Sequence, residues 1–258
     1  MTGSSGNGVI LTARDHQLLS ELTFHKLLNR EQVKVAAGFS STTSVNIRLL
    51  KLTHAGFLRR FFLPTRAGGR AAVYALSAKG AALAGYSGRL IQRTRDALLI
   101  GDLFVTHQLS INDEFLQLRC RALPGGARLK RQRNFSVPLA ASCPLIPDGY
   151  FEIETSEKVQ SLFFEVDLGT EPLRVWARKV ELYVKLAVSG EFESLFGQPR
   201  FRVLVAASSE RRLSGIRKTA VLQTDKIFWF STLDDINREG LFARIWQKSI
   251  GDKRLPLL

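Results

Sequence analysis

The feature that most constrains the fold of this chain is a short apolar stretch with two acids, Phe163-Phe164-Glu165-Val166-Asp167. In a β-strand, successive side chains point to opposite faces, so Phe163, Glu165 and Asp167 would share one face. Carboxylates on an otherwise apolar face need a partner, because burying an unpaired charge is costly. A divalent metal ion is a common partner for such a pair.

A third acid, Asp148, lies in the segment Pro147-Asp148-Gly149, at the start of another predicted strand. We expect strands over residues 148–155 and 160–168 to pair and to bring Asp148 beside Glu165 and Asp167. Three carboxylates would form an oxygen-lined pocket suited to Mg²⁺ or Mn²⁺. The alternative is a polar strand edge without a function.

The net charge of +14 indicates a polyanionic partner, and nucleic acid fits it best. We expect a cytoplasmic protein without membrane insertion, because the chain has no apolar run of membrane-spanning length and no signal peptide. The two cysteines, Cys120 and Cys143, form no CxxC motif, which argues against a zinc site.

The charge is uneven, with 14 Lys and Arg against 4 Asp and Glu in residues 1–100, which predicts two domains. We expect a mixed α and β chain with a flexible leader over residues 1–8 and a winged helix-turn-helix domain over residues 9–80. A helical connector over residues 81–100 and a second domain over residues 101–258 would follow.

The winged-helix prediction depends on three helix starts and a hairpin. Thr12, Asn29 and Ser41 (or Ser40) are suitable N-caps, and apolar strands over 57–63 and 71–76 flank a basic, glycine-containing turn. The third helix of this fold enters the major groove of double-stranded DNA, and the hairpin contacts the backbone or minor groove. The expected DNA contacts are polar and basic, although ordinary solvation would also explain them: Thr42, Thr43, Asn46, Arg48, Lys51, Arg66 and Arg70. We expect the inward face of the third helix to carry Val45, Leu49, Leu50 and Leu52.

Beyond residue 100, the pattern predicts a helix over residues 101–121 with an apolar stripe made of Leu103, Phe104, His107, Ile111 and Phe115. His107 is either a hydrogen-bonded core residue or a catalytic one. Residues 201–207 form a continuous apolar run, which is typical of a strand buried on both faces. A cap at Thr170 is expected to begin a long helix, and residues 236–250 are expected to be helical.

From residue 101, the predicted order of helix, three strands, helix and strand resembles that of the restriction-endonuclease-like, or PD-(D/E)xK, nucleases. Pro147-Asp148, Glu165-Val166-Asp167 and the helix after them carry this resemblance. It implies that the Asp and the Glu bind Mg²⁺ and that a Lys two residues after the Glu activates water. Asp167 stands at that position, so Lys179 on the next helix would supply the amine, with Tyr183 one turn later.

The chain also resembles the plasmid replication-relaxation family, which includes the MobC-class relaxases, over roughly residues 10–210. The segments that carry this resemblance are short and keep their order: Leu11 to Asp15, Val73 to Ser77, His107 to Asp113, Pro147-Asp148, and Phe164 to Glu171. The resemblance implies metal-dependent nicking of one DNA strand at a transfer or replication origin. The predicted catalytic residues are Asp148, Glu165, Asp167, Lys179 and His107.

Two other functions stay open at this point. Because the usual lysine is absent, the protein could be a non-catalytic DNA-binding factor for replication, transfer or copy control with a degenerate nuclease fold. A plain transcription regulator is the third reading. A homodimer and contacts with other transfer or replication proteins also stay open.

Overall fold

The computed structural model describes residues 9–65, 68–88, 90–91 and 98–258. The chain forms two compact units, Met1–Leu116 and Gln117–Leu258, called the first unit and the second unit here. The division falls within helix α5 (Leu98–Cys120). Among the described residues, no helix is both long enough and apolar enough to cross a bilayer.

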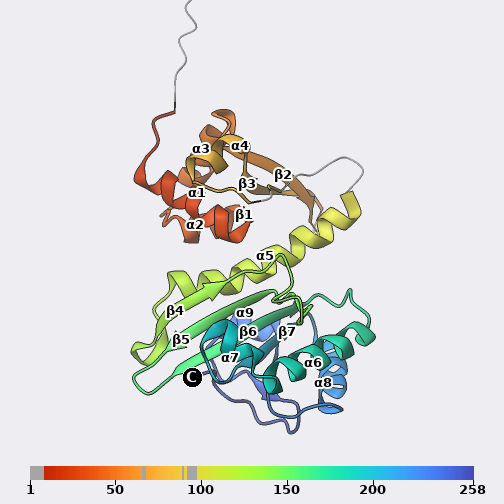
Figure 1. The fold of residues 1–258 in the computed structure, drawn as a ribbon. Coiled ribbons are helices and arrows are strands. Elements are labelled where there is room, and N and C mark those ends of the chain that lie inside the picture. Colours follow the sequence, from red (N-terminus) through yellow and green to blue (C-terminus); the bar gives the residue numbers. More distant parts are fainter. Residues whose placement is uncertain (1–8, 66–67, 89, 92–97) are drawn as a thin grey trace, which may run out of the picture. The chain divides into compact units, whose positions relative to one another are not determined.

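The first unit contains short helices and a small antiparallel sheet (Figure 1). Before α5, its elements are α1 (Ala13–His25), β1 (Leu27–Asn29), α2 (Arg30–Ala36), α3 (Thr42–His54), β2 (Leu58–Pro64), β3 (Arg70–Leu76) and α4 (Ala78–Leu83). The three predicted N-caps precede α1, α2 and α3. The side chains of Asn29 and Ser41 each accept a hydrogen bond from a first-turn amide, which satisfies a donor that the helix leaves unpaired.

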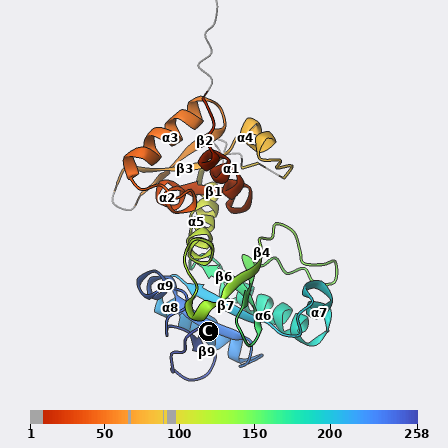
Figure 2. The same cartoon turned by 90° about the vertical axis from the view of Figure 1, so that its left-hand side faces the viewer.

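Both faces of the three-stranded sheet, which has the order β1-β3-β2, are covered. On one side, Leu28 and Tyr74 join a core formed with helices α1, α2 and α3 (Figure 2). On the other side, Leu27 and Val73 pack with Val105 of α5. Helix α5 therefore belongs to the core of the first unit.

Two details of the predicted apolar faces are wrong. Leu50 was expected to face inward with Leu49, but its side chain is 43% exposed while Leu49 is fully buried. Successive helix positions lie about 100° apart, so neighbours in sequence need not share a face. On α5, Leu103 and Phe104 are exposed, although Ile111 and Phe115 are buried as predicted.

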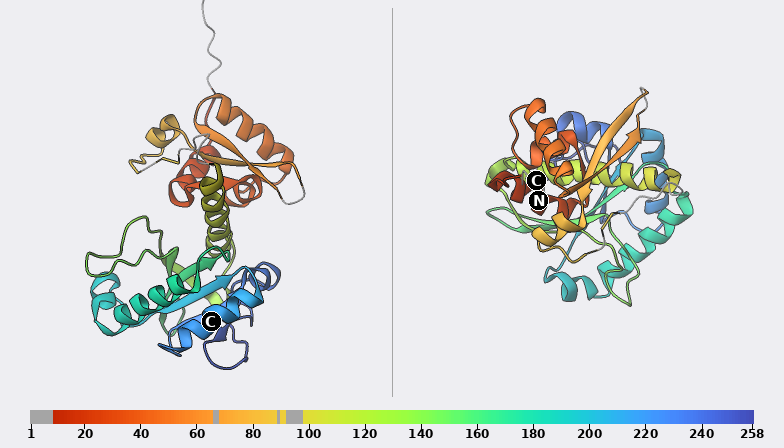
Figure 3. Two further views of the ribbon diagram at one scale, coloured as in Figure 1. Left: turned by 90° about the vertical axis from the view of Figure 1, so that its right-hand side faces the viewer. Right: turned by 90° about the horizontal axis from the view of Figure 1, so that it is seen from above.

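The second unit is a mixed sheet with helices (Figures 1 and 3). After α5, its elements are η2 (Pro124–Gly126), β4 (Arg128–Arg133), β5 (Gly149–Glu154), β6 (Val159–Asp167), α6 (Leu173–Val188), α7 (Glu191–Phe196), β7 (Arg202–Ala207), α8 (Glu210–Val221), β8 (Phe228–Thr232), α9 (Leu233–Glu239) and β9 (Gln247–Lys248). The strand order follows the sequence from β4 to β9, and β6, β7 and β8 run parallel to one another. The remaining pairs are antiparallel.

Helices α6, α7 and α8 contribute to one hydrophobic core with residues of β5 to β8. The core is rich in aromatic rings, and Phe163 of β6 contacts the rings of Tyr150, Tyr183 and Phe201 at centroid distances of 5.0, 5.4 and 5.1 Å. Strand β7 is buried from Val203 to Ala207, as its continuous apolar run predicts. This packing fixes α6 against the acidic face of β6.

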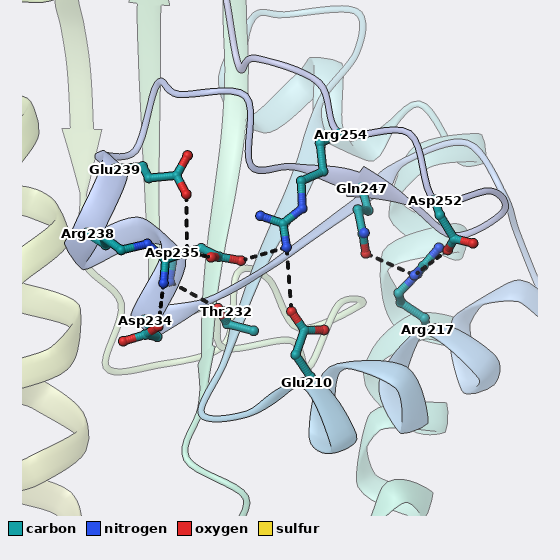
Figure 4. A network of polar contacts seen from close by, with 10 residues as sticks. All are labelled: Glu210, Arg217, Thr232, Asp234, Asp235, Arg238, Glu239, Gln247, Asp252 and Arg254. Atoms are coloured by element: carbon teal, nitrogen blue, oxygen red, sulfur yellow. Dashed lines mark hydrogen bonds and ion pairs between the residues drawn. The ribbon is translucent and has the colours of Figure 1, made fainter.

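The C-terminal segment differs from the prediction of a helix over residues 236–250. Helix α9 ends at Gly240, whose φ of 95° lies in the region that favours glycine. Backbone hydrogen bonds between Trp246 and Leu255 and the ion pairs of Figure 4 then hold this segment. Arg254 contacts Glu210 at 3.7 Å and Asp235 at 3.2 Å, which links the end of the chain to α8 and α9.

Candidate active site

Strand β6 presents its two acids to the same neighbour. Glu165 and Asp167 both bond to side chains of α6, the helix that follows β6 in the chain. Glu165 is fully buried and Asp167 is 3% exposed. The alternation expected of a strand is therefore present, and both carboxylates lie inside the unit where every oxygen needs a donor.

Two residues of α6 satisfy the Glu165 carboxylate. Lys179 Nζ lies 3.0 Å from Glu165 Oε2, and Tyr183 Oη donates to Glu165 Oε1 at 2.5 Å. Lys179 and Tyr183 are four residues apart, a spacing that puts both on one side of a helix. Lys179 also lies 3.5 Å from Glu171 Oε2, so its ammonium group bridges two acids.

Burial and neighbouring charges act in opposite directions on these groups. Burial raises the pKa of Glu165 to about 7, although the Lys179 ammonium group lowers it. Burial alone would lower the pKa of Lys179, but the carboxylates of Glu165, Asp148 and Glu171 outweigh it and the pKa is raised. Lys179 therefore stays protonated, and the pKa of Glu165 lies above its ordinary value.

Asp148 lies immediately before β5, beside Glu165. Its Oδ2 accepts a hydrogen bond of 2.8 Å from the backbone N–H of Val166. The register of the β5–β6 pair, with Gly149 opposite Phe164, accounts for this placement. Asp148 is half-buried and close enough to raise the pKa of both Glu165 and Lys179 through its charge. The structure thus brings together Asp148, Glu165 and Lys179.

Asp167 differs from its predicted role as a third metal ligand. Arg212 Nε and Nη2 donate to its two oxygens at 2.6 and 2.7 Å, and Trp176 Nε1 donates at 2.6 Å. Burial opposes ionisation of Asp167, but these hydrogen bonds and that of the Gly169 N–H outweigh it and lower its pKa. A guanidinium group takes the position that the prediction gave to a metal ion.

No group of three or more His, Cys, Asp and Glu side chains is placed to hold a metal ion in the described part of the chain. The three-acid pocket is therefore reduced to Asp148 and Glu165, with Glu171 held by Lys179 at the rim. Sequence reasoning missed Arg212. Its position in the first turn of α8, directly after a strand that runs parallel to β6, was the available signal.

The residues predicted to contact DNA fall into different environments. Thr43, Asn46 and Lys51 are exposed on α3, and Thr42 is half-buried at its start. Arg70 is exposed at the start of β3, with its guanidinium group 5.8 Å from the ring of Phe62. Arg66 lies outside the described residues.

Arg48 is not available as a DNA contact in this structure. Its Nε donates to Asp15 Oδ1 at 2.7 Å, and its Nη2 donates to Asp15 Oδ2 and to the carbonyl of Ile10. Asp15 is 1% exposed, so the pair ties α3 to the start of α1. The positive charge of Arg48 is neutralised by Asp15 within the first unit.

The motif from His107 to Asp113 has a structural role in the first unit. Asn112 Nδ2 donates to the carbonyls of His25 and Leu27 at 3.2 and 2.6 Å. Gln32 Nε2 donates to Asp113 Oδ1 at 2.7 Å. These bonds attach α5 to α1, β1 and α2. His107 is half-buried on α5 in the same unit, and its catalytic role stays a prediction.

The sequence profile of the replication-relaxation family matches residues 19–197, and the chain belongs to this family. Membership suggests a role in DNA processing. Among solved structures, the restriction endonuclease FokI is similar over 88% of this chain and 43% of its own, with 13% identity and a TM-score of 0.34. FokI bound to DNA is similar over 88% of this chain and 44% of its own, with 11% identity and a TM-score of 0.29. The chain thus spans less than half the length of FokI. No match was found among curated proteins.

Proposed function

We propose that the protein is a metal-dependent DNA nickase of a plasmid or another mobile element, which recognises a transfer or replication origin through its first unit. The observation that carries the proposal is the convergence of Asp148, Glu165 and Lys179 at one end of β6. Two acids and one amine are the groups that the PD-(D/E)xK resemblance requires. Lys179, placed on α6, supplies the amine that the position of Asp167 lacks.

The order of elements in the second unit supports the same assignment. Helix α5, of which only the last residues belong to the second unit, is followed by β4, β5 and β6, then by α6 and, after α7, by β7. This matches the helix, three strands, helix and strand of the restriction-endonuclease-like nucleases. In that arrangement the acids lie at the start of the second strand and the end of the third, as Asp148 and Glu165 do.

The first unit supports a winged helix-turn-helix reader. Three helices precede the β2–β3 hairpin, and α3 exposes Thr43, Asn46 and Lys51. Residues 32–95 contain 11 Lys and Arg and no Asp or Glu, so a phosphate backbone is the complementary partner. We assign α3 to the major groove and the hairpin, with Arg70, to the backbone.

The residues of the site fit a divalent ion held by two carboxylates. Mg²⁺ is commonly bound through one or two carboxylates together with substrate phosphates, so Asp148 and Glu165 suffice as protein ligands. Asp167 does not fit, because three donors of Arg212 and Trp176 hold its two oxygens. Oε2 of Glu165 is held by the single ammonium group of Lys179, which would have to move aside for an ion. When bound, Mg²⁺ or Mn²⁺ would act as a Lewis acid on the scissile phosphate.

The remaining chemistry falls to side chains of this chain. Lys179, protonated beside Glu165, is suited to orient a water molecule or to stabilise charge on the phosphate. Tyr183 holds Glu165 in place through its hydrogen bond. Because Tyr183 is fully buried, a covalent tyrosyl intermediate is not part of the proposal.

A nicking assay tests the proposal. Supercoiled plasmid that carries the protein's own origin should become open circular with Mg²⁺ or Mn²⁺ and stay supercoiled with chelator. Asp148→Asn, Glu165→Gln and Lys179→Met should each slow nicking by at least about a hundredfold. Binding of the same origin duplex, measured in parallel, should be unchanged. Glu181→Gln, an exposed acid on the same helix, is the matched control and should nick at the wild-type rate.

The second candidate is a non-catalytic DNA-binding regulator of replication or transfer. It is favoured by the ion pairs of Lys179 with Glu165 and of Arg212 with Asp167, which satisfy the acids without a metal. This function is the correct one if wild-type protein binds the origin duplex but leaves supercoiled DNA intact with every divalent ion tested.

A further inference from the structure

The exposed face of α3 combines polar and apolar side chains in an unusual way. Ile47 is 51% exposed and Leu50 is 43% exposed. They lie between Thr43, Asn46 and Lys51, which are also exposed. Single exposed apolar residues are common and need no explanation. Here, however, two branched aliphatic side chains three positions apart are neighbours on one helix face.

The fold does not require these two residues to be apolar. The core of the first unit takes Val45, Leu49 and Leu52 from α3, and all three are fully buried. Ile47 and Leu50 point away from that core, so polar residues would serve folding equally well. A binding partner outside the chain accounts better for the apolar character of these two exposed side chains.

The charge of the sequence segment that contains α3 favours nucleic acid as the partner. From residue 32 to residue 95, the chain carries 11 basic residues and no acidic one. A second copy of the chain would bring the same sign of charge to the face and would be repelled. A DNA groove brings phosphates together with base edges. The one apolar group that the major groove displays is the C5-methyl of thymine.

We infer that Ile47 and Leu50 read thymine methyl groups in the major groove, an inference that rests on the proposed DNA-binding function. Helix residues three apart are about 5–6 Å apart at Cβ. Bases of one strand follow at about 3.4 Å along the axis. The two side chains therefore reach methyl groups one or two base steps apart. Asn46, next to Ile47, is suited to the paired hydrogen bonds that adenine offers, so the recognised element is rich in A·T pairs.

Replacement of thymine by uracil tests the inference, because uracil keeps every hydrogen bond and lacks only the methyl group. The full-length protein selects a duplex from a random-sequence pool of double-stranded DNA, and that duplex is resynthesised with single thymines changed to uracil. Loss of one contacted methyl should weaken binding about fourfold. Sensitive positions should be few and should lie one or two steps apart.

Variants connect each methyl to a side chain. Ile47→Gln and Leu50→Gln change exposed positions, so both proteins should unfold at the wild-type denaturant concentration. Each should bind the thymine duplex about fourfold more weakly and lose sensitivity to uracil at one position, as a double-mutant cycle requires. Val35→Thr, at a 48% exposed position on α2, is the matched control and should keep the wild-type uracil profile.

Three results would overturn the inference. Equal binding of the thymine and uracil duplexes by wild-type protein would exclude methyl contacts while leaving DNA binding intact. A concentration-dependent dimer that Leu50→Gln abolishes, again without uracil sensitivity, would assign the face to a second copy. If no duplex is bound at all, the proposed function fails and this inference fails with it.

Discussion

Glu165 and Asp167 are two residues apart on one face of one strand, yet their neighbours drive their ionisation in opposite directions. Burial raises the pKa of Glu165 to about 7, and the fork of Arg212 helps to hold that of Asp167 below its ordinary value. Carboxylates whose environments separate their pKa values commonly divide the work of a site. The Glu165 carboxylate depends on the donors Lys179 and Tyr183, whereas the pairing of Asp167 with Arg212 fixes the geometry of the strand end.

Removal of the Asp167 charge should destabilise the second unit in a pH-dependent way. Asp167→Asn leaves the Arg212 guanidinium group without its carboxylate, so the free energy of unfolding should fall by about 3 kcal/mol at pH 7. A lowered native pKa contributes stability above the unfolded value of 3.8, and this contribution disappears as the pH falls through the native pKa. The difference in free energy of unfolding between the wild-type protein and Asp167→Asn should therefore be constant from about pH 5 to pH 8. It should shrink below about pH 4.

Urea unfolding followed by tryptophan fluorescence measures this difference, because all three tryptophans, Trp176, Trp229 and Trp246, belong to the second unit. Asp252→Asn is the matched control. Its carboxylate also pairs with an arginine, Arg217, but is 92% exposed, so it should cost less than about 1 kcal/mol. If the difference in free energy of unfolding between wild type and Asp167→Asn is the same at about pH 3 as at about pH 7, the ion pair of Asp167 with Arg212 does not have the assigned role.

At the scale of elements, helix α5 is held to the first unit by polar groups as well as by apolar packing. The side-chain amide of Asn112 supplies donors to the carbonyls of His25 and Leu27, at the junction of α1 and β1. Asn112 is fully buried. Buried carbonyls without donors are costly, so this one side chain should control how firmly α5 is attached.

Asn112→Ala should lower the local stability of the first unit by about 2 kcal/mol, because two buried carbonyls lose their side-chain donor. Hydrogen exchange of backbone amides near β1 and the start of α2 should accelerate correspondingly. Ser110→Ala, which removes a bond of 3.2 Å to Thr106 within α5 itself, is the control and should leave exchange at β1 unchanged. Equal exchange in Asn112→Ala and wild-type protein would show that apolar packing alone holds α5.

The elements that local signals define were predictable from the sequence. Thr12, Asn29 and Ser41 mark helix starts because such side chains are suited to accept a hydrogen bond from a backbone N–H of the first turn, as Asn29 and Ser41 do. The three-residue strand β1 was missed, since its pairing partner β3 is remote in sequence. The helix start expected at Thr170 was also wrong, because α6 begins after Pro172.

The candidate site was predictable where it depends on periodicity. Strand alternation and helical spacing bring Lys179 and Tyr183 to Glu165. The pairing of Arg212 with Asp167 joins residues 45 positions apart and depends on the parallel register of β6 and β7. Such a register cannot be read from either strand alone, so the sequence could not distinguish an arginine partner from a metal ion.

At the scale of the whole molecule, the uneven charge determines how the proposed binding to DNA should respond to salt. The acid-free region from residue 32 to residue 95 lies in the first unit, whereas the acids of the candidate site lie in the second. Binding that neutralises phosphates releases counterions, so affinity must fall steeply with salt. Base contacts add affinity without this dependence.

Two variants of α3 separate these contributions. Lys51→Ala should reduce the slope of log affinity against log salt concentration by about one, because one phosphate contact is lost. Asn46→Ala should weaken binding to the selected duplex and leave that slope unchanged, because it removes a neutral contact. Measurements of duplex binding over a series of salt concentrations test both. An unchanged slope for Lys51→Ala would remove α3 from the phosphate-contacting surface.

The contact of Lys179 Nζ with Glu165 Oε2, 3.0 Å long, means that the free protein carries its own counterion. In the proposed nickase, Asp148 and Glu165 would hold a divalent ion only after the Lys179 ammonium group had left Glu165. The cost of binding the ion would then include the cost of breaking the Lys179–Glu165 ion pair, and DNA phosphates, which attract the ammonium group, would reduce that cost. DNA and the metal ion would in that way bind cooperatively, and the protein without DNA would be inactive as a nickase.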